Sequence, residues 1–226
     1  MLALPPGTAE TFAALLLAHV LADFVFQTGW MVRHKCNVFV LLLHIAIVFG
    51  LTTATLGGVW QVALPVAFAH LVIDALKVYA LPDRARATFS AFIADQSLHL
   101  ATLVTAACIW PAGFAAGQLA PFAVQLTAPA LLVSGLIVTV IAGGHAVGLL
   151  TARFVAQVDQ DGLPDAGRLI GQLERGLIFL LIFLNQPAGI GFLIAAKSIL
   201  RYDTTAQQKA GEYVIIGTLA SFTWAL

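Results

Sequence analysis

Residues 11–28 read TFAALLLAHVLADFVFQT. Most of them are apolar, and the run approaches the roughly 20 residues that a helix needs to cross a membrane. Three polar residues interrupt the run at a spacing of four, namely His19, Asp23 and Gln27. Because four residues are little more than one helical turn, these side chains share one face. The stretch therefore predicts a membrane-spanning helix with a polar stripe.

Further apolar runs follow along the whole chain. The hydrophobic runs cover 11–28, 38–56, 60–80, 89–110, 130–152, 177–200 and 211–226, with a loop around Pro111, Pro121 and Pro129 before the fifth run. Hydrophobic residues make up 60% of the 226 residues and charged residues only 10%, against about 25% charged in soluble domains. We therefore predict an all-α fold, a polytopic integral membrane helix bundle of six to seven hydrophobic segments forming a single membrane domain over 1–226. The net charge of zero argues against a nucleic-acid partner.

The basic residues predict the orientation of the bundle. Arg33 and Lys35 follow the first run, Arg84 and Arg86 follow the third, and Arg153 follows the fifth. The loops after the second and fourth runs carry no charge. Because lysine and arginine prefer the cytoplasmic side, we expect the N-terminus outside and the chain in a bacterial inner (cytoplasmic) membrane.

The sixth run, 177–200, is interrupted at positions 185–187 by Asn-Gln-Pro. A plain crossing would place Lys197 and Arg201 outside, against the charge rule. A re-entrant hairpin bent at these three residues would keep them on the cytoplasmic side, and proline favours such a break because it lacks a backbone donor. The sequence leaves both the hairpin and an ordinary kinked span open. The charged stretch 153–175 before it predicts an interfacial segment within the C-terminal helices 130–226.

Five of the six histidines lie inside apolar runs, and aspartates accompany them. Two pairs are HxxxD, His19/Asp23 and His70/Asp74, and a third pair is the reverse, Asp95/His99. Ionisable groups within a membrane are costly and mark function by default. The predicted orientation puts all of them at a similar depth, in one layer near the cytoplasmic face. We expect the following to converge: His19, Asp23, His44, His70, Asp74, Asp95 and His99.

A short repeat accompanies these pairs. Residues 18–23 read AHVLAD and residues 69–74 read AHLVID, an offset of 51. The four-helix polar-site core 11–110 thus suggests a tandem repeat of 11–56 and 60–110. Membrane proteins with such repeats often have their site where the two halves meet.

The types of side chain in this layer suggest a chemistry. Three carboxylates packed together repel one another unless they are protonated or neutralised by a cation. Histidine with carboxylate is a ligand set for Zn, Mn or Fe, so we expect all seven residues of the layer to bind a divalent metal ion. The leading hypothesis is a membrane-embedded, metal-dependent hydrolase that acts near the cytoplasmic face. Asp74, Asp95 and His99 are its candidate catalytic residues. Candidate substrate contacts are Gln27, Lys77, Gln96, Lys197 and Arg201. The bilayer is the easiest route to the site, so a lipid-linked ester or phosphoester is the expected substrate, with membrane lipid as partner.

Two other functions fit the same residues. A transporter or channel would use them as a proton or cation relay without a tightly held metal. A haem-binding membrane subunit would use paired histidines and would leave the aspartates unexplained. His145, alone in the fifth run, fits a structural hydrogen bond better than a ligand. Cys36 and Cys108 fall near opposite ends of a span of about 30 Å, so we predict two free thiols.

The polar motifs of the first four runs resemble those of a bacterial inner-membrane family of unknown function. The shared motifs are His19-x3-Asp23-x3-Gln27, His44, His70-x3-Asp74-x2-Lys77 and Asp95-Gln96-x2-His99. Longer members of that family are similar to this chain at three further stretches, 171–175, 196–201 and 212–221. The resemblance covers nearly the whole chain and implies no established activity.

A looser likeness is to inner-membrane proteins described as metal-dependent hydrolases, which share HxxxD motifs within the membrane. It covers only the first four runs. HxxxD is a short motif, so this likeness implies only that a hydrolase remains one of the expected functions given above.

Overall fold

A computed structural model describes residues 5–155, 166–200 and 208–226, without the side chains of 198–200 and 208–210. The chain divides into two compact units, Met1–Ile137 (unit 1) and Val138–Leu226 (unit 2). Every regular element in the described ranges is helical, and none is a strand. The predicted all-α class is therefore confirmed.

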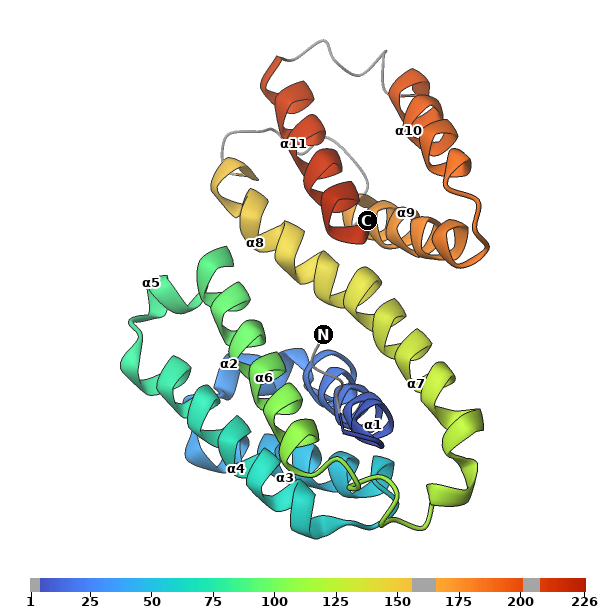
Figure 1. Cartoon of the computed structure of the whole chain (residues 1–226). Helices are drawn as coiled ribbons and strands as arrows, with labels where there is room; N and C mark the ends of the chain where they lie inside the picture. The colour runs from blue at the N-terminus through green and yellow to red at the C-terminus, as the bar shows by residue number, and fades with distance from the viewer. Residues whose placement is uncertain (1–4, 156–165, 201–207) are drawn as a thin grey trace. The chain divides into compact units, whose positions relative to one another are not determined.

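Unit 1 contains the first four predicted spans and the start of the fifth (Figure 1). Its elements are α1 (Thr8–Leu21), η1 (Ala22–Phe26), α2 (Gly29–His34), α3 (Val38–Thr55), α4 (Trp60–Ala75), η2 (Leu76–Ala80), α5 (Asp83–Arg86), α6 (Phe89–Ile109), η3 (Ala120–Phe122) and α7 (Ala123–Ile137). Both η1 and η2 are π-helical extensions of the helix before them. Such wide turns are frequent at functional sites.

Polar side chains mark where helices begin in unit 1. The side chain of Asn37 accepts a hydrogen bond from Phe39 N at 2.9 Å at the start of α3. Thr88 does the same at the start of α6, with Ala91 N 3.2 Å from its hydroxyl. These caps satisfy backbone N–H groups that have no partner within the helix.

In the part of the chain that the structure describes, five helices are long and apolar enough to cross a membrane: Thr8–Phe26, Val38–Thr55, Trp60–Ala80, Phe89–Ile109 and Ala120–Val155. The first four agree closely with the predicted runs. The fifth begins at Ala120, ten residues before the predicted start, because Pro121 and Pro129 lie within helices and not in a loop. Proline at the first turn of a helix loses no backbone hydrogen bond, which explains Pro121.

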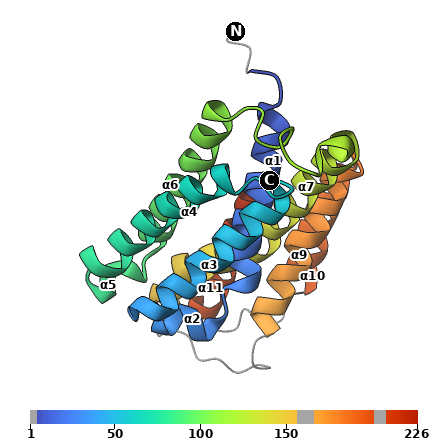
Figure 2. The ribbon, with the colours of Figure 1, turned by 90° about the horizontal axis from the view of Figure 1, so that it is seen from below.

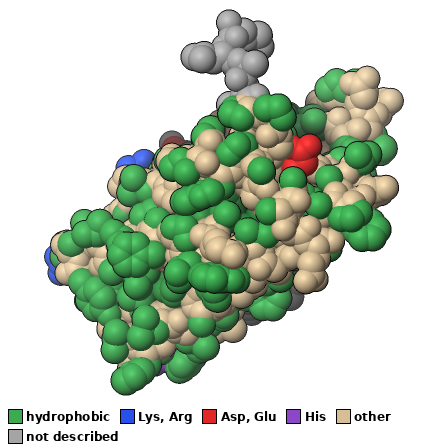
Figure 3. All heavy atoms as spheres, turned by 60° about the horizontal axis from the view of Figure 1, so that its bottom comes forward, with side chains coloured by type: hydrophobic (Ala, Val, Ile, Leu, Met, Phe, Trp, Pro, Cys, Tyr) green, Lys and Arg blue, Asp and Glu red, His purple; other side chains and the backbone are tan. Residues whose placement is uncertain are grey.

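Apolar side chains face outward from these helices as well as inward. Phe39, Phe68 and Val124 are among the large hydrophobic residues that are exposed. Hydrophobic side chains cover much of the face in Figure 3, where charged groups are few. A surface of this kind suits lipid tails, which cannot solvate a charge.

The two ends of unit 1 differ. Figure 2 shows the short helices α2 and α5 at one end and the start of α1 at the other. At the α1 end uncharged loops pack tightly: the Thr11 hydroxyl donates to Pro111 O at 2.9 Å, and Gln118 N donates to Gly57 O at 2.9 Å. Gly57 has a φ of 66°, a conformation that favours glycine. Lysine and arginine in the loops of unit 1 are confined to the α2 and α5 end.

Unit 2 consists of helices alone in its described part. Its elements are η4 (Val138–Ala142), α8 (Gly143–Val155), α9 (Ala166–Phe183), α10 (Ala188–Leu200) and α11 (Gln208–Ala225). The second part of the predicted interfacial segment, 166–175, is the beginning of α9.

The predicted break in the sixth run is confirmed. Helix α9 ends at Phe183 and α10 begins at Ala188, with Asn185 between them in the left-handed region at φ 55°. Ile178 of α9 and Ile190 of α10 share one apolar core, so the chain folds back on itself there. Arg201 and the side chain of Lys209, which we expected on the same side as Arg33, lie outside the described residues. The two cysteines, Cys36 and Cys108, are free thiols as predicted.

Candidate metal centre

Helices α1, α3, α4 and α6 together with η1 bring seven side chains together in unit 1. We call this group the His/Asp cluster, and it consists of His19, Asp23, His44, His70, Asp74, Asp95 and His99. His44 is fully buried, and the exposed fraction of the Asp74 residue is 1%. The cluster lies toward the α2 and α5 end, because Lys35 and Lys77 reach into it.

Three atoms of the cluster form a nearly equilateral triangle. His44 Nε2 and His70 Nε2 are 3.2 Å apart, and Asp23 Oδ1 lies 3.3 Å from the first and 3.4 Å from the second. Tetrahedral zinc with bonds of about 2.0–2.1 Å separates its ligand atoms by about 3.3–3.4 Å. The triangle therefore has the dimensions of one face of such a coordination sphere.

A second triangle shares the edge between the two histidines. Asp74 Oδ2 lies 3.5 Å from His44 Nε2 and 3.5 Å from His70 Nε2. The same Asp74 oxygen is 2.8 Å from the ammonium of Lys35. Among the described residues, no such ammonium lies beside Asp23 in the first triangle. The two triangles thus offer similar ligand atoms, but one of them already holds a positive charge.

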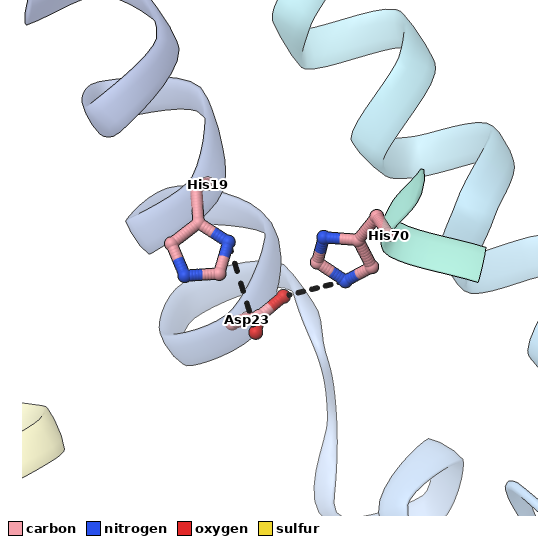
Figure 4. Close-up of side chains that lie close together, drawn as sticks. All are labelled: His19, Asp23 and His70. Carbon is pink, nitrogen blue, oxygen red and sulfur yellow. Dashed lines mark ion pairs between the residues drawn. The ribbon is translucent and has the colours of Figure 1, made fainter. Parts of the chain in front are cut away.

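His19 stands beside the first triangle. Figure 4 shows His19 and His70 on either side of Asp23, with His19 Nδ1 at 3.9 Å from Asp23 Oδ2. Ligand atoms of these three residues all lie within 4.8 Å of one another, as do those of His44, His70 and Asp74. These two groups overlap the first triangle and add His19 and Asp74 to the candidate ligands among the described residues.

Gln96 fixes the protonation of His19. Its amide nitrogen faces two carboxylates, Asp95 Oδ2 at 3.2 Å and Asp23 Oδ2 at 3.4 Å. A carboxylate only accepts hydrogen bonds, so the NH₂ group points there and the amide oxygen faces His19 Nε2 at 3.3 Å. His19 Nε2 must then carry the hydrogen. Its Nδ1, which has no hydrogen-bond partner among the described residues, keeps a lone pair.

One ring nitrogen of His99 is also held by a hydrogen bond while the other is left free, but here Nδ1 is the bonded nitrogen. Its Nδ1 donates to the backbone oxygen of Asp95 at 2.9 Å, which leaves Nε2 with a lone pair. Nε2 is buried, and no described residue forms a hydrogen bond with it. The His99 ring centroid is 4.0 Å from that of His70 and 5.1 Å from that of His19. A histidine held by a backbone carbonyl with its other nitrogen free is ready to bind a metal or accept a proton.

Two lysines neutralise two of the three aspartates. Lys77 pairs with Asp95 at 2.9 Å, and Lys35 pairs with Asp74 at 2.8 Å. Across the described part of the chain, no lysine or arginine lies within ion-pair distance of Asp23. The aspartates of the cluster, which the sequence led us to expect to repel one another, therefore differ sharply in their charge environment.

Sequence reasoning missed Lys35, which it treated only as a loop charge that orients the bundle. Lys77, predicted to contact substrate, pairs with Asp95. Gln27 follows η1, and its buried amide nitrogen has no hydrogen-bond partner in the described part of the chain. A count of three aspartates against the nearest basic residues is the signal that would have drawn attention to Lys35.

The remaining predicted substrate contacts belong to unit 2. Lys197 on α10 pairs with Glu174 on α9 at 2.7 Å, and Arg201 lies outside the described residues. Beside this pair the buried Arg175 donates to Ser221 Oγ and to Val140 O, each at 3.0 Å. The stretches 171–175, 196–201 and 212–221 thus supply residues that hold unit 2 together, and the π-helical η4 offers the carbonyl that Arg175 uses.

Comparison with known proteins gives a match to a family model. No curated protein and no solved structure matches the chain. Residues 11–122 match the model of a family described as protein of unknown function (DUF3307). This segment includes every member of the His/Asp cluster together with Lys35 and Lys77. Residues 11–122 are therefore similar to this DUF3307 family of unknown function.

Proposed function

We propose that the His/Asp cluster binds one divalent metal ion and that the chain is a membrane-embedded, metal-dependent hydrolase. The triangle of His44 Nε2, His70 Nε2 and Asp23 Oδ1 carries this proposal. Its edges of 3.2–3.4 Å fit ligands of a single small cation. All three side chains are buried or nearly so. Ionisable side chains within a membrane need a partner, such as a cation, that offsets the cost of removing them from water.

The donor set favours a metal that accepts both nitrogen and carboxylate oxygen, such as Zn, Mn or Fe. Asp23, His44 and His70 would hold it, and His19 Nδ1 is the nearest further lone pair. Such an ion activates water and polarises a scissile bond. An open coordination position for water is typical of catalytic sites with three protein ligands.

His99 is the best candidate for moving a proton. Its Nε2 is free, and the hydrogen bond from Nδ1 to Asp95 O fixes the ring. A general base needs an available lone pair within reach of the attacking water, and the ring lies against that of His70. Asp95, predicted as catalytic, forms an ion pair with Lys77. This ion pair suits Asp95 better to a structural role in the site than to accepting a proton.

A lipid-linked ester or phosphoester is the proposed substrate, reached from the cytoplasmic side of an inner membrane with the N-terminus outside. The basic residues of the α2 and α5 loops support this orientation. Trp30 and Tyr79 are exposed at the same end, where aromatic side chains suit the membrane–water boundary. Lys77 is about a quarter exposed and can meet an anionic head group.

The relay is the second candidate, and one observation favours it. The rings of His44, His70, His99 and His19 follow one another with centroids 4.0–5.2 Å apart. Such a chain of imidazoles suits proton transfer along the cluster. This function predicts ion flux in proteoliposomes and no retained metal, whereas a strong Soret band would identify a haem protein.

The decisive experiment is elemental analysis of the full chain, purified in detergent with a tag that contains no histidine. We expect about one Zn, Mn or Fe per chain, and loss of that metal in the variant His70→Gln. His34→Gln is the matched control, because His34 is exposed, lies outside the His/Asp cluster and has its Nδ1 2.9 Å from Trp30 O. Folded protein that retains no metal after incubation with each ion would overturn the proposal.

A further inference from the structure

An apolar cleft lies between α1, α3 and α7 within unit 1. Its volume is about 370 Å³, which is in the range typical of sites for small molecules. From α1 it is lined by Glu10, Ala13, Ala14 and Leu17. Two residues turn a helix by about 200°, so Leu17 and His19 face nearly opposite directions. The cleft is therefore separate from the His/Asp cluster, which lies on another face of α1.

Small side chains create the hollow. Ala14 of α1, Ala54 of α3 and Ala130 of α7 line it from three sides. Phe114 lines it as well, and its backbone N donates a hydrogen bond to the Thr11 hydroxyl at 3.0 Å, which fixes this part of the wall. Such a hollow among membrane helices suits a hydrocarbon chain, because its walls offer van der Waals contacts and little that needs water.

Glu10 is the charged residue of this lining, and it is partly exposed. The lining also includes Thr55 and Thr127, whose hydroxyls donate to carbonyls of their own helices, Thr52 O at 3.3 Å and Ala123 O at 2.7 Å. Of the residues that the structure describes, no basic side chain lies within ion-pair distance of Glu10. The Glu10 carboxylate therefore offers an unused negative charge beside an apolar hollow.

We propose that the cleft binds a phospholipid with a primary ammonium in its head group, of the phosphatidylethanolamine type. One acyl chain lies in the hollow, and the ammonium contacts Glu10. An ammonium has three N–H donors and forms charge-assisted hydrogen bonds with a carboxylate. A lipid with a negative head group and no ammonium, such as phosphatidylglycerol, is repelled by Glu10.

A lipid fits this charge better than a second copy of the chain. The loop lysines and arginines of unit 1 are at the α2 and α5 end, whereas Glu10 is in the first turn of α1. The length of a span of about 20 residues, about 30 Å, separates the two ends. Copies inserted in the same direction would keep those basic loops away from Glu10, while head groups of lipids lie at its level.

The test uses the full-length chain in detergent micelles that contain equal amounts of phosphatidylethanolamine and phosphatidylglycerol with identical acyl chains. Native mass spectrometry counts each lipid that the protein retains. We expect the wild type to prefer phosphatidylethanolamine about fivefold, as one ion pair near water can provide. Glu10→Gln should remove this preference. Ala54→Trp, which fills the cleft from an exposed position, should lower the retention of phosphatidylethanolamine itself.

Two matched controls change the same kinds of group elsewhere. Asp83→Asn removes a negative charge and Ala101→Trp adds an indole, each at an exposed position outside the cleft. Both should bind lipid as the wild type does.

Equal retention of the two lipids by the wild type would overturn the proposal, and so would a preference that Glu10→Gln keeps. Unchanged retention in Ala54→Trp would mean that the acyl chain lies elsewhere. A dimer of the chain that disappears in Ala54→Trp would mean that a second copy fills the cleft, which also contradicts the proposal. If Ala54→Trp does not fold, Ala130→Trp takes its place. These outcomes do not depend on the proposed metal site, because no cluster residue is changed.

Discussion

The two halves of the four-helix core, 8–55 and 60–109, have the same order of elements but different ionic partners. Each half is a long helix with a π-helical end, a short helix and a second long helix. Helices α3 and α6 start 51 residues apart, which is the offset of the short sequence repeat. At that same offset His44 of the first half corresponds to Asp95 of the second.

The difference between the halves lies in which carboxylates have lysine partners. Asp74 and Asp95, both in the second half, each pair with a lysine. Among the described residues, the ion-pair and hydrogen-bond partners of Asp23, in the first half, are histidines and Gln96. Neither half contains the whole triangle, because Asp23 and His44 come from one half and His70 from the other. A repeated backbone can therefore form a single asymmetric site when its polar residues diverge.

The largest expected effect is a difference in metal affinity between a variant of Asp23, which has no lysine partner among the described residues, and a variant of Asp95, which pairs with Lys77. Asp23→Asn should weaken metal binding more than about 100-fold, because even residues that only orient a ligand contribute about 10–100-fold. Asp95→Asn should keep the metal, since Asp95 completes neither triangle. Titration with Zn²⁺ against a competing chelator measures both. Equal losses in the two folded variants would mean that the halves contribute alike.

A smaller effect is expected from Gln96, which connects the halves. Gln96→Leu should lower metal affinity about 10–100-fold, because the amide holds Asp23 and fixes His19 with its hydrogen on Nε2. In metal-free protein labelled with ¹⁵N-histidine, the His19 signals should change from one tautomer to a mixture. A merely structural role would leave the tautomer unchanged.

Gln27→Leu serves as the control for Gln96→Leu, since Gln27 lies on the polar stripe of His19 and Asp23 but its amide nitrogen has no hydrogen-bond partner among the described residues. We expect its His19 spectrum to match the wild type. If Gln96→Leu gave a wild-type spectrum as well, another group would have to set the protonation of His19.

The sequence predicted the parts of this site that follow from helical geometry. Residues four apart share a face, so His19 with Asp23 and His70 with Asp74 were found from spacing alone. Lys35 was missed because it lies in a loop, where no periodicity indicates the direction of a side chain. The orientation of the Gln96 amide depends on two carboxylates from different helices, and that is tertiary information.

Proline had both expected and unexpected effects. The break at 185–187 was predicted, since proline there follows two polar residues in an otherwise apolar run. Pro121 and Pro129 were expected in a loop, but helix continues through both. Proline is tolerated in membrane helices where neighbours satisfy the freed backbone, so its presence alone does not determine where such a helix begins.

The smallest expected effect is a change in stability at the helix caps, which are alike in the two halves. Asn37 and Thr88 occupy equivalent positions, 51 residues apart, and each caps the long helix that follows. Replacing either by Ala removes one hydrogen bond to a helix N-terminus, which costs about 0.5–2 kcal/mol. Thr88 also donates to Ala85 O at 2.8 Å, so Thr88→Ala should cost slightly more than Asn37→Ala. Thermal unfolding in one detergent compares the two, with Asn37→Asp and Thr88→Ser as variants that keep the cap.

Metal content should not change in any of these cap variants, because the caps lie outside both triangles. A loss of metal in Asn37→Ala but not in Thr88→Ala would mean that the backbone of the first half, and not only its side chains, is specialised for the site.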